Sequence, residues 1–421
     1  MLMLRVRWLV GLTPLILLVG ILIASVVSPT GGRAPAPIME EIPVLNSQEQ
    51  PLCPEQLDFP KEAPILRVPQ DFSTIQAAIN AAPEGATIQI SPGAYTESLI
   101  IRKSVRIQGV ARDQVVLKSA NQNWSAILIV SGYDESLMVV IENLTIAESL
   151  VGVEVIGVPT AVIQYNAFRD NGTSILTLAT AELLPFSAAR GGGAFICGNI
   201  FEDGTGVYAV PRDQHYLWII GNSFRNIDVG VRLEKSYVKG QGTEPLRTIF
   251  PRVYIKKNTM KEIKSLGVIL LDSAGVMIQE NTIEGSTNKY RSSGVVITGS
   301  EAILESNTIH GHRRSGVEIG SGELLKGRAL LKGNRIENNG RSEGFPSGGV
   351  VISLLSQAEL IENRISDNAG WGILVGSSWS VEVCRGNQVI GNGSGDYGWY
   401  SIYPPAGPQP SPELKQKCEG S

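Results

Sequence analysis

Short apolar runs separated by polar turns follow one another along most of the chain. Runs such as residues 253–255 and 276–278 are three or four residues long, and a turn follows each of them. Side chains in these runs alternate with a period of two, which is typical of β-strands with one buried face and not of helices. The pattern predicts many short strands.

A repeat is superimposed on these strands. Asparagine with an apolar residue two positions later recurs at Asn166, Asn199, Asn222, Asn258, Asn281, Asn307, Asn334, Asn363 and Asn387. Asn143 resembles an offset earlier copy, and Gly followed by apolar-x-apolar recurs between the asparagines, as at Gly152 and Gly267. The base period is about 23–27 residues, with insertions at roughly 172–195 and 236–251.

Strands this short cannot form a stable sheet alone. Stacked coil on coil, equivalent strands pair at about 4.8 Å, and their inward Val, Ile and Leu form one column. Asparagines at one corner can pass amide hydrogen bonds along the stack. The repeat therefore predicts an all-β, single-stranded right-handed parallel β-helix over residues 65–395. Leucine-rich repeats and propellers need patterns that are absent.

The ends of this solenoid need covers, because unpaired strand edges promote aggregation. Apolar residues at helical spacing predict a capping α-helix over residues 72–82, with Asp71 or Ser73 as N-cap. Strands are expected at 87–90, 99–101, 105–107 and 115–117. The aromatic and Pro-rich tail, residues 396–421, is expected to cover the other end.

The N-terminus predicts export. Arg5 and Arg7 precede an apolar run over residues 8–27. Such a run is long enough to span a bilayer, and the positive-inside rule places the chain beyond it outside the cytoplasm. Residues 1–28 are interpreted as a membrane-spanning anchor or a cleaved signal helix, and residues 29–64 as a Pro-rich linker. The body is then extracytoplasmic in either case.

Composition narrows the possible partners. Net charge is −4 with 18% charged residues, which gives no basic stripe for nucleic acid. Four cysteines allow three full pairings, and the sequence does not choose among them. Cys384 is interpreted as an apolar core residue.

The residues described so far resemble the pectin-lyase-like superfamily over roughly residues 65–395. Residues 71–82, 88–97 and 105–109 resemble the opening of pectin methylesterases and many exported β-helix proteins. The Asn-x-Ile and Gly-Val-x-Val coils resemble the repeats of periplasmic copper-site maturation proteins and of carbohydrate-binding and sugar-hydrolase modules. The resemblance implies the fold, but this scaffold hosts many activities.

The segments that carry catalysis in such enzymes are missing. The chain has no Asp-Asp pair and no Asp-Pro-His-Asp segment. His310-Gly-His312-Arg-Arg could be a two-His metal site or a cationic clamp for sugar acids, or a solvated turn between Ile309 and Gly316. Two histidines lack the further ligands that zinc requires, so the turn is preferred. We predict no metal and no cofactor.

The outward residues of the Gly-Val-x-Val strands are the candidate binding residues. Early coils place Glu154, Tyr208, Arg232 and Glu234 there, an aromatic and charged set suited to sugars. Later coils carry an apolar stripe, Ile269, Val296, Val351 and Leu374, which suggests burial under the tail or a partner.

The sequence leaves two functions open. The first is a membrane-anchored or secreted module that binds polysaccharide or a cell-surface protein without catalysis. The alternative is a lyase or glycoside hydrolase that acts on uronate-containing glycans with a divergent site. The missing carboxylate pairs favour binding.

Overall fold

The computed structural model describes residues 63–131, 136–157, 159–178, 193–211, 215–235, 251–286, 291–322, 326–341, 346–401 and 406–419. They belong to a compact unit that runs from Gln50 to Ser421. No helix in these ranges is both long and apolar enough to cross a bilayer. The predicted N-terminal segment 1–28 and nearly all of the linker lie outside the described residues.

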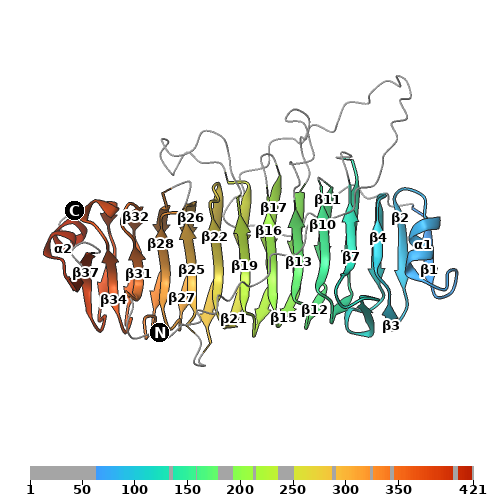
Figure 1. Cartoon of the computed structure of the whole chain (residues 1–421), viewed down its shortest axis with the longest axis horizontal. Helices are drawn as coiled ribbons and strands as arrows, with labels where there is room; N and C mark the ends of the chain where they lie inside the picture. The colour runs from blue at the N-terminus through green and yellow to red at the C-terminus, as the bar shows by residue number, and fades with distance from the viewer. Residues whose placement is uncertain are drawn as a thin grey trace, which may run out of the picture. The chain divides into compact units, whose positions relative to one another are not determined.

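Three sheets, A, B and C, build the solenoid, and successive coils add one strand to each; the strands pair in parallel, except for β38 at the C-terminal end of sheet C (Figure 1). Sheet A contains β1 (Ile65–Val68), β2 (Ala86–Ile90), β5 (Val105–Gly109), β8 (Met138–Glu142), β11 (Thr160–Gln164), β14 (Gly193–Cys197), β17 (Tyr216–Ile220), β20 (Val253–Lys256), β23 (Val276–Gln279), β26 (Glu301–Glu305), β29 (Arg328–Lys332), β32 (Gln357–Ile361) and β35 (Val381–Arg385). Sheet B contains β3 (Gly93–Thr96), β6 (Val115–Lys118), β9 (Thr145–Ala147), β12 (Ala167–Arg169), β15 (Ile200–Glu202), β18 (Ser223–Arg225), β21 (Thr259–Ile263), β24 (Thr282–Gly285), β27 (Thr308–His310), β30 (Arg335–Glu337), β33 (Arg364–Ser366) and β36 (Gln388–Ile390).

Sheet C contains β4 (Leu99–Ile101), β7 (Ser125–Val130), β10 (Val151–Ile156), β13 (Thr173–Leu178), β16 (Thr205–Val210), β19 (Val229–Glu234), β22 (Leu266–Leu271), β25 (Ser293–Thr298), β28 (Ser315–Gly320), β31 (Gly348–Ile352), β34 (Trp371–Val375), β37 (Gly395–Ser401) and β38 (Ala406–Pro410). The helices are α1 (Ile75–Ala81) and α2 (Pro412–Glu419), with short 3-10 turns at Arg112–Gln114 and Ser378–Ser380. The predicted β-helix and its early strands are confirmed. The stretch at 172–195 was interpreted wholly as an insertion, which is wrong, because it contains β13 and the start of β14.

The interior is one continuous apolar column of inward side chains from all three sheets. Phe168, Phe201 and Phe224 stack inside sheet B with ring centroids 5.1 and 4.5 Å apart. The recurring glycine has a steric cause: a Cβ on Gly267 would lie 2.5 Å from the Gly294 carbonyl oxygen. The coils therefore approach one another too closely at this corner for a side chain.

The asparagine ladder lies inside the corner between sheets A and B. From Asn166 to Asn363, each Nδ2 donates to the Oδ1 of the next asparagine at 2.9–3.2 Å and to a main-chain carbonyl of the preceding coil. The ladder therefore satisfies buried backbone groups and is structural. Asn143 is not an early copy, since Leu144 takes the ladder position and donates its N–H to Asn166.

A second ladder, which was not predicted from the sequence, lies in the corner between sheets B and C. Asn339 donates to Asn368, Asn368 to Asn392, and Asn392 to the Asp396 carboxylate, at 2.8–3.1 Å. Its asparagines stand five residues after those of the first ladder, and this spacing was the available signal.

The N-terminal cap is α1, as predicted, but its first turn is capped differently. Thr74 is the N-cap, and its hydroxyl accepts from the Ala77 N–H at 3.2 Å. Asp71 instead accepts from the Arg67 N–H, so neither predicted cap residue is correct. Glu97 accepts from two further free N–H groups of the first turn, at 2.9 and 3.0 Å.

The C-terminal tail covers the other end, as expected. Strand β38 pairs antiparallel with β37, and Leu414 of α2 is buried in the core column. Cys384 is not a free core residue: it forms a disulfide with Cys418 of α2 while remaining 4% exposed. Cys197 is disulfide-bonded as well.

Candidate functional site

The outward face of sheet C carries the four side chains predicted to bind a ligand. The strand register places Tyr208 of β16 beside Arg232 of β19, and Glu234 follows two residues later on the same face. Glu154 of β10 lies two strands from Tyr208, because Leu176 of β13 stands between them. The structure therefore brings three of the four residues together and leaves Glu154 apart.

The three clustered residues are held by direct contacts. The Tyr208 hydroxyl donates to Glu234 Oε2 at 2.9 Å, and Arg232 Nε donates to Glu234 Oε1 at 2.7 Å. The Arg232 guanidinium also lies 5.1 Å from the centre of the Tyr208 ring. Carboxylate, phenol and guanidinium are thus pre-oriented, while the Arg232 side chain keeps 43% exposure toward solvent.

Tyr208 is a proton donor in this arrangement. Burial raises its pKa above the ordinary value, the hydrogen bond to Glu234 raises it further, and only the Arg232 charge opposes this. A phenol with a raised pKa keeps its proton at neutral pH. Tyr208 is accordingly suited to hydrogen bonding and is a poor general base.

Glu154 and Glu234 are too far apart to act on one glycosidic bond. Glu154 accepts from the Ser125 hydroxyl, and three strand steps separate β10 from β19. Three steps correspond to about 14 Å, whereas paired carboxylates of glycosidases stand about 5–9.5 Å apart. Glu154 and Glu234 cannot form such a pair.

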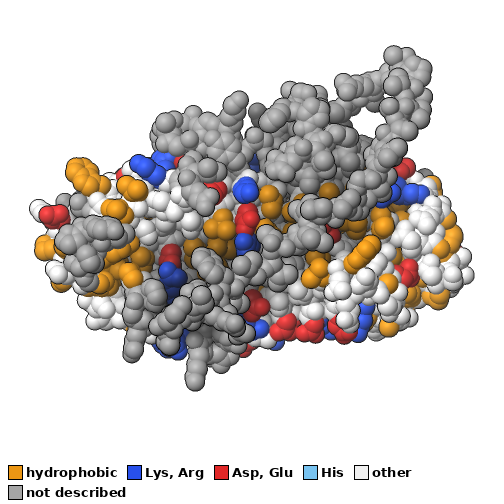
Figure 2. Space-filling view, in the orientation of Figure 1, with side chains coloured by type: hydrophobic (Ala, Val, Ile, Leu, Met, Phe, Trp, Pro, Cys, Tyr) orange, Lys and Arg blue, Asp and Glu red, His pale blue; other side chains and the backbone are white. Residues whose placement is uncertain are grey.

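Apolar side chains flank the cluster along the same face. Figure 2 shows hydrophobic side chains gathered over the strands of sheet C, with charged side chains between them. The partly buried members are Leu128, Val130, Ile156, Leu176, Leu178 and Val210 on the earlier coils and Ile269, Leu271 and Val296 on the later ones. The face is thus a long, mostly apolar strip that is interrupted by the Tyr208–Arg232–Glu234 cluster and, three strands further along, by Glu318 of β28, which pairs with Arg314 at 3.1 Å.

The end of the predicted apolar stripe is covered by the tail. Val351 and Leu374 are buried with Trp371, and Tyr400 of β37 packs against them. Ile269 and Val296 remain partly exposed. The stripe therefore divides into a part that anchors the C-terminal cap and a part that stays open.

A row of aromatic side chains on the outward face of sheet A was missed. Trp218 packs edge-on against Phe195 at 5.2 Å and against Tyr254 at 5.8 Å. These three residues occupy equivalent positions on successive strands. The signal was present, since each is the outward member of the apolar run that precedes a ladder asparagine.

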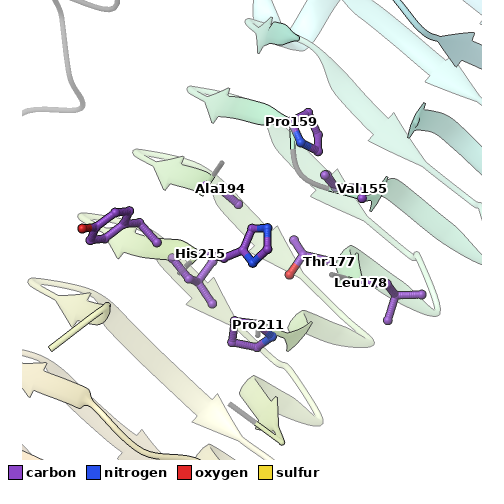
Figure 3. Close-up of a pocket in the computed structure, with 11 residues that line it drawn as sticks. Val155, Pro159, Thr177, Leu178, Ala194, Pro211 and His215 are labelled. Atoms are coloured by element: carbon purple, nitrogen blue, oxygen red, sulfur yellow. The ribbon is translucent and has the colours of Figure 1, made fainter. Parts of the chain in front are cut away.

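A small pocket lies where strands of sheet C lead into strands of sheet A (Figure 3). The His215 ring lies among Thr177, Ala194 and Pro211 in this view. Its enclosed space holds only about two water molecules, so it does not accommodate a sugar ring. Of the two insertions predicted at roughly 172–195 and 236–251, residues 179–192 and 236–250 lie outside the described residues.

The His310–His312 segment is not a solvated turn. His312 is fully buried at the corner of the second ladder, and its main-chain N–H donates to Asn339 Oδ1 at 3.0 Å. Its ring nitrogens lie 3.3 Å from the Ser292 hydroxyl and the Ile283 carbonyl. Within the described part of the chain, no three metal-ligating side chains gather at one point. Through its hydrogen bonds to Asn339 and the Ile283 carbonyl, His312 takes the position of an asparagine in the second ladder.

Burial makes this histidine sensitive to acid. Desolvation lowers the pKa of His312 to about 3, against 6.5 ordinarily. Below pH 6.5 the unfolded chain binds a proton at this histidine that the native chain does not bind. The free energy of unfolding therefore decreases as the pH is lowered. We expect about 2 kcal/mol less stability at pH 5 than at pH 7 from this group. His312→Asn, measured by urea unfolding, should remove that difference, whereas His310→Asn should retain it; equal pH dependence in all three proteins would contradict this.

Comparison with known proteins defines the class of protein. Residues 266–403 match the family model described as a right-handed β-helix region. The coils and this match together define a right-handed parallel β-helix, and the predicted superfamily resemblance is confirmed at the level of fold. No curated protein matches the chain.

Several solved structures are similar to the chain. A double mutant of a periplasmic alginate epimerase is 14% identical, with a TM-score of 0.46 and 80% of each chain covered. The A-module of a mannuronan C-5 epimerase from Azotobacter vinelandii is 16% identical, with a TM-score of 0.41, covering 78% of this chain and 86% of that one. A pectate lyase is 13% identical, with a TM-score of 0.38, covering 76% and 75%. Similarity at this level assigns no activity to the chain.

Proposed function

We propose that this chain is an extracytoplasmic β-helix protein that binds an extended polysaccharide along sheet C without cleaving it. The observation that carries the proposal is the Tyr208–Arg232–Glu234 cluster, fixed at the centre of an apolar strip that runs along the coils. Apolar and aromatic surface suits sugar faces, and an exposed guanidinium suits their hydroxyl or carboxylate groups. The strip has the extended form that a polymer requires.

The location outside the cytoplasm rests on two features. The apolar N-terminal run predicts membrane anchoring or secretion. The Cys384–Cys418 disulfide suits an oxidising compartment. An anchored β-helix would display the strip to surface glycans.

We infer the absence of catalysis from the hydrogen bonds that Glu234 already makes within the cluster. Glu234 already accepts from Tyr208 and Arg232, and Glu154, the other predicted carboxylate, lies three strand steps away, too far for a hydrolytic pair. A lyase that acts on uronate glycans is the second candidate, because Arg232 could neutralise the carboxylate of a bound uronate beside Tyr208, whose hydroxyl could donate a proton.

The decisive experiment incubates the purified protein with a panel of uronate and neutral glycans. Retention on glycan affinity gels and release of unsaturated or shortened products are both measured. We expect retention without products. Products would favour the lyase or hydrolase, and no retention at all would favour a protein partner; either result would overturn the proposal.

Arg232→Ala should weaken glycan binding about tenfold, because one charge-assisted contact is worth about 1.4 kcal/mol. Affinity electrophoresis or calorimetry with the retained glycan measures the change. Arg335→Ala is the matched control, since Arg335 makes the same pairing with Glu337 two residues later, at 2.7 Å, on sheet B. Equal weakening in both variants would place the binding surface elsewhere.

A further inference from the structure

The outward face of sheet C carries a glutamate on every third strand from β10 to β28. These residues are Glu154 of β10, Glu234 of β19 and Glu318 of β28. Three strand steps, about 14 Å, separate each of these strands from the next, and the whole row spans about 29 Å. A linear ligand that lies along the strip therefore passes a carboxylate at both ends and in the middle.

The two outer carboxylates are held in the same way. The hydroxyl of Ser125, at the start of β7, donates to Glu154, and the hydroxyl of Ser293, at the start of β25, donates to Glu318 Oε1 at 2.7 Å. In each pair the serine belongs to the strand that precedes the glutamate in the sheet. The Glu318 side chain keeps 16% exposure and that of Glu234 keeps 19%, so a ligand on the strip can contact them.

The arginines beside these glutamates are already paired with them. Arg232 Nε donates to Glu234 Oε1 at 2.7 Å, and Arg314 Nε lies 3.1 Å from Glu318 Oε1. Three carboxylates, counting Glu154, thus stand against two guanidinium groups. The positive charge that Arg232 and Arg314 bring is therefore compensated before any ligand binds.

Two further cations lie near these strands, in the corners of the coil. Lys235 follows the last residue of β19 and has a φ of +53°, and Arg291 stands two residues before the start of β25. Neither belongs to a strand of sheet C. Neither therefore adds a positive charge to an outward strand position of the strip.

We propose that the strip binds a neutral polysaccharide in preference to a polyuronate, a preference that depends on the proposed binding of a glycan to this face. A polyuronate carries a carboxylate on every sugar, and over a length of about 29 Å several of these meet the three glutamates. Each contact between like charges at about 4 Å costs about 1 kcal/mol even in water.

A neutral glycan meets the same surface without this cost. Its hydroxyl groups donate to carboxylates in charge-assisted hydrogen bonds, which are stronger than bonds between neutral groups. Its apolar ring faces suit the outward side chains between the glutamates, which are Leu176, Ile269 and Val296.

The preference is measured on the full-length protein with glycans of known charge. Retention on gels of dextran, mannan and β-glucan is compared with retention on gels of polygalacturonate and alginate. The retained neutral glycan is then carboxymethylated, which adds charge to the same backbone, and both forms are titrated by calorimetry. We expect the charged form to bind about tenfold more weakly at low salt, and the difference to shrink as salt is raised, because salt screens the repulsion.

Glu154→Gln with Glu318→Gln removes two of the negative charges and keeps an oxygen that accepts from the serine in each pair. The charged and neutral forms should then bind within about twofold of each other. Glu305→Gln is the matched control, because Glu305 lies on sheet A and pairs there with Lys332 at 3.0 Å. The difference of about tenfold should persist in this control. An equal change in the control would mean that total charge sets the preference, which contradicts the proposal.

The outcomes separate the preference from the binding itself. If polygalacturonate or alginate is retained at least as well as every neutral glycan, the preference is overturned while glycan binding stands. If no glycan of either kind is retained, the binding and the preference both fail. The titrations of the wild-type protein decide the preference even if the double variant does not fold.

Discussion

Asn281→Ala is expected to lower the free energy of unfolding by about 4 kcal/mol, because it removes an acceptor from the middle of a buried ladder. Asn281 Oδ1 accepts from the Asn258 main-chain N–H at 2.9 Å and from Asn258 Nδ2 at 3.0 Å. Its own Nδ2 donates to Asn307 Oδ1 at 3.0 Å and to the Ile255 carbonyl at 2.8 Å. Alanine leaves two buried donors of Asn258 without an acceptor, and each such loss costs about 1–3 kcal/mol.

Urea unfolding followed by circular dichroism measures this effect. Asn80→Ala is the control, because Asn80 is an exposed residue of α1 whose contact with Gln76 lies on the surface. The control should change stability by less than about 0.5 kcal/mol. A loss below about 1 kcal/mol for Asn281→Ala would show that neighbouring coils or water replace the ladder contacts.

Replacing Cys384 and Cys418 together by serine should destabilise the C-terminal end by about 4 kcal/mol. The bond closes a loop with a sequence separation of 34, and a crosslink of that span restricts the unfolded chain by about this amount. It also ties α2 to β35, so its loss frees the helix that covers the last coil. In a solenoid each coil contacts mainly its neighbours, so the effect should remain local.

Hydrogen exchange resolved by peptide is therefore the appropriate measurement. Protection should fall in β34, β35 and β37 and persist in the early coils, and the wild-type protein under reductant should match the variant at this end. Uniform loss of protection along the chain would contradict local stabilisation by the cap.

The repeat allowed sequence reasoning to find the architecture but not every coil. The Gly-apolar-x-apolar pattern identified the strands that contain Tyr208 and Arg232 and correctly aligned these residues. It missed β13, because Ser174 replaces the usual glycine there. One unrecognised coil was enough to place Glu154 beside Tyr208, although Leu176 separates them.

The remaining differences arise where contacts join residues far apart in the sequence. Glu97 caps α1 from the connection between β3 and β4, and Cys418 reaches Cys384 only because α2 folds back over the last coil. His312 resembles a solvated turn residue by its polar neighbours, yet the stacking of coils buries it. None of these contacts leaves a local pattern in the residues concerned.

By itself the sequence determined the β-helix, the first asparagine ladder and the outward faces, because each depends on a period that local alternation and spacing record. Only the tertiary structure decided the number of coils between two outward residues, the second ladder, the burial of His312 and the cysteine pairing at the C-terminal end. These depend on register between coils, and register is set by packing across the stack rather than by neighbours along the chain.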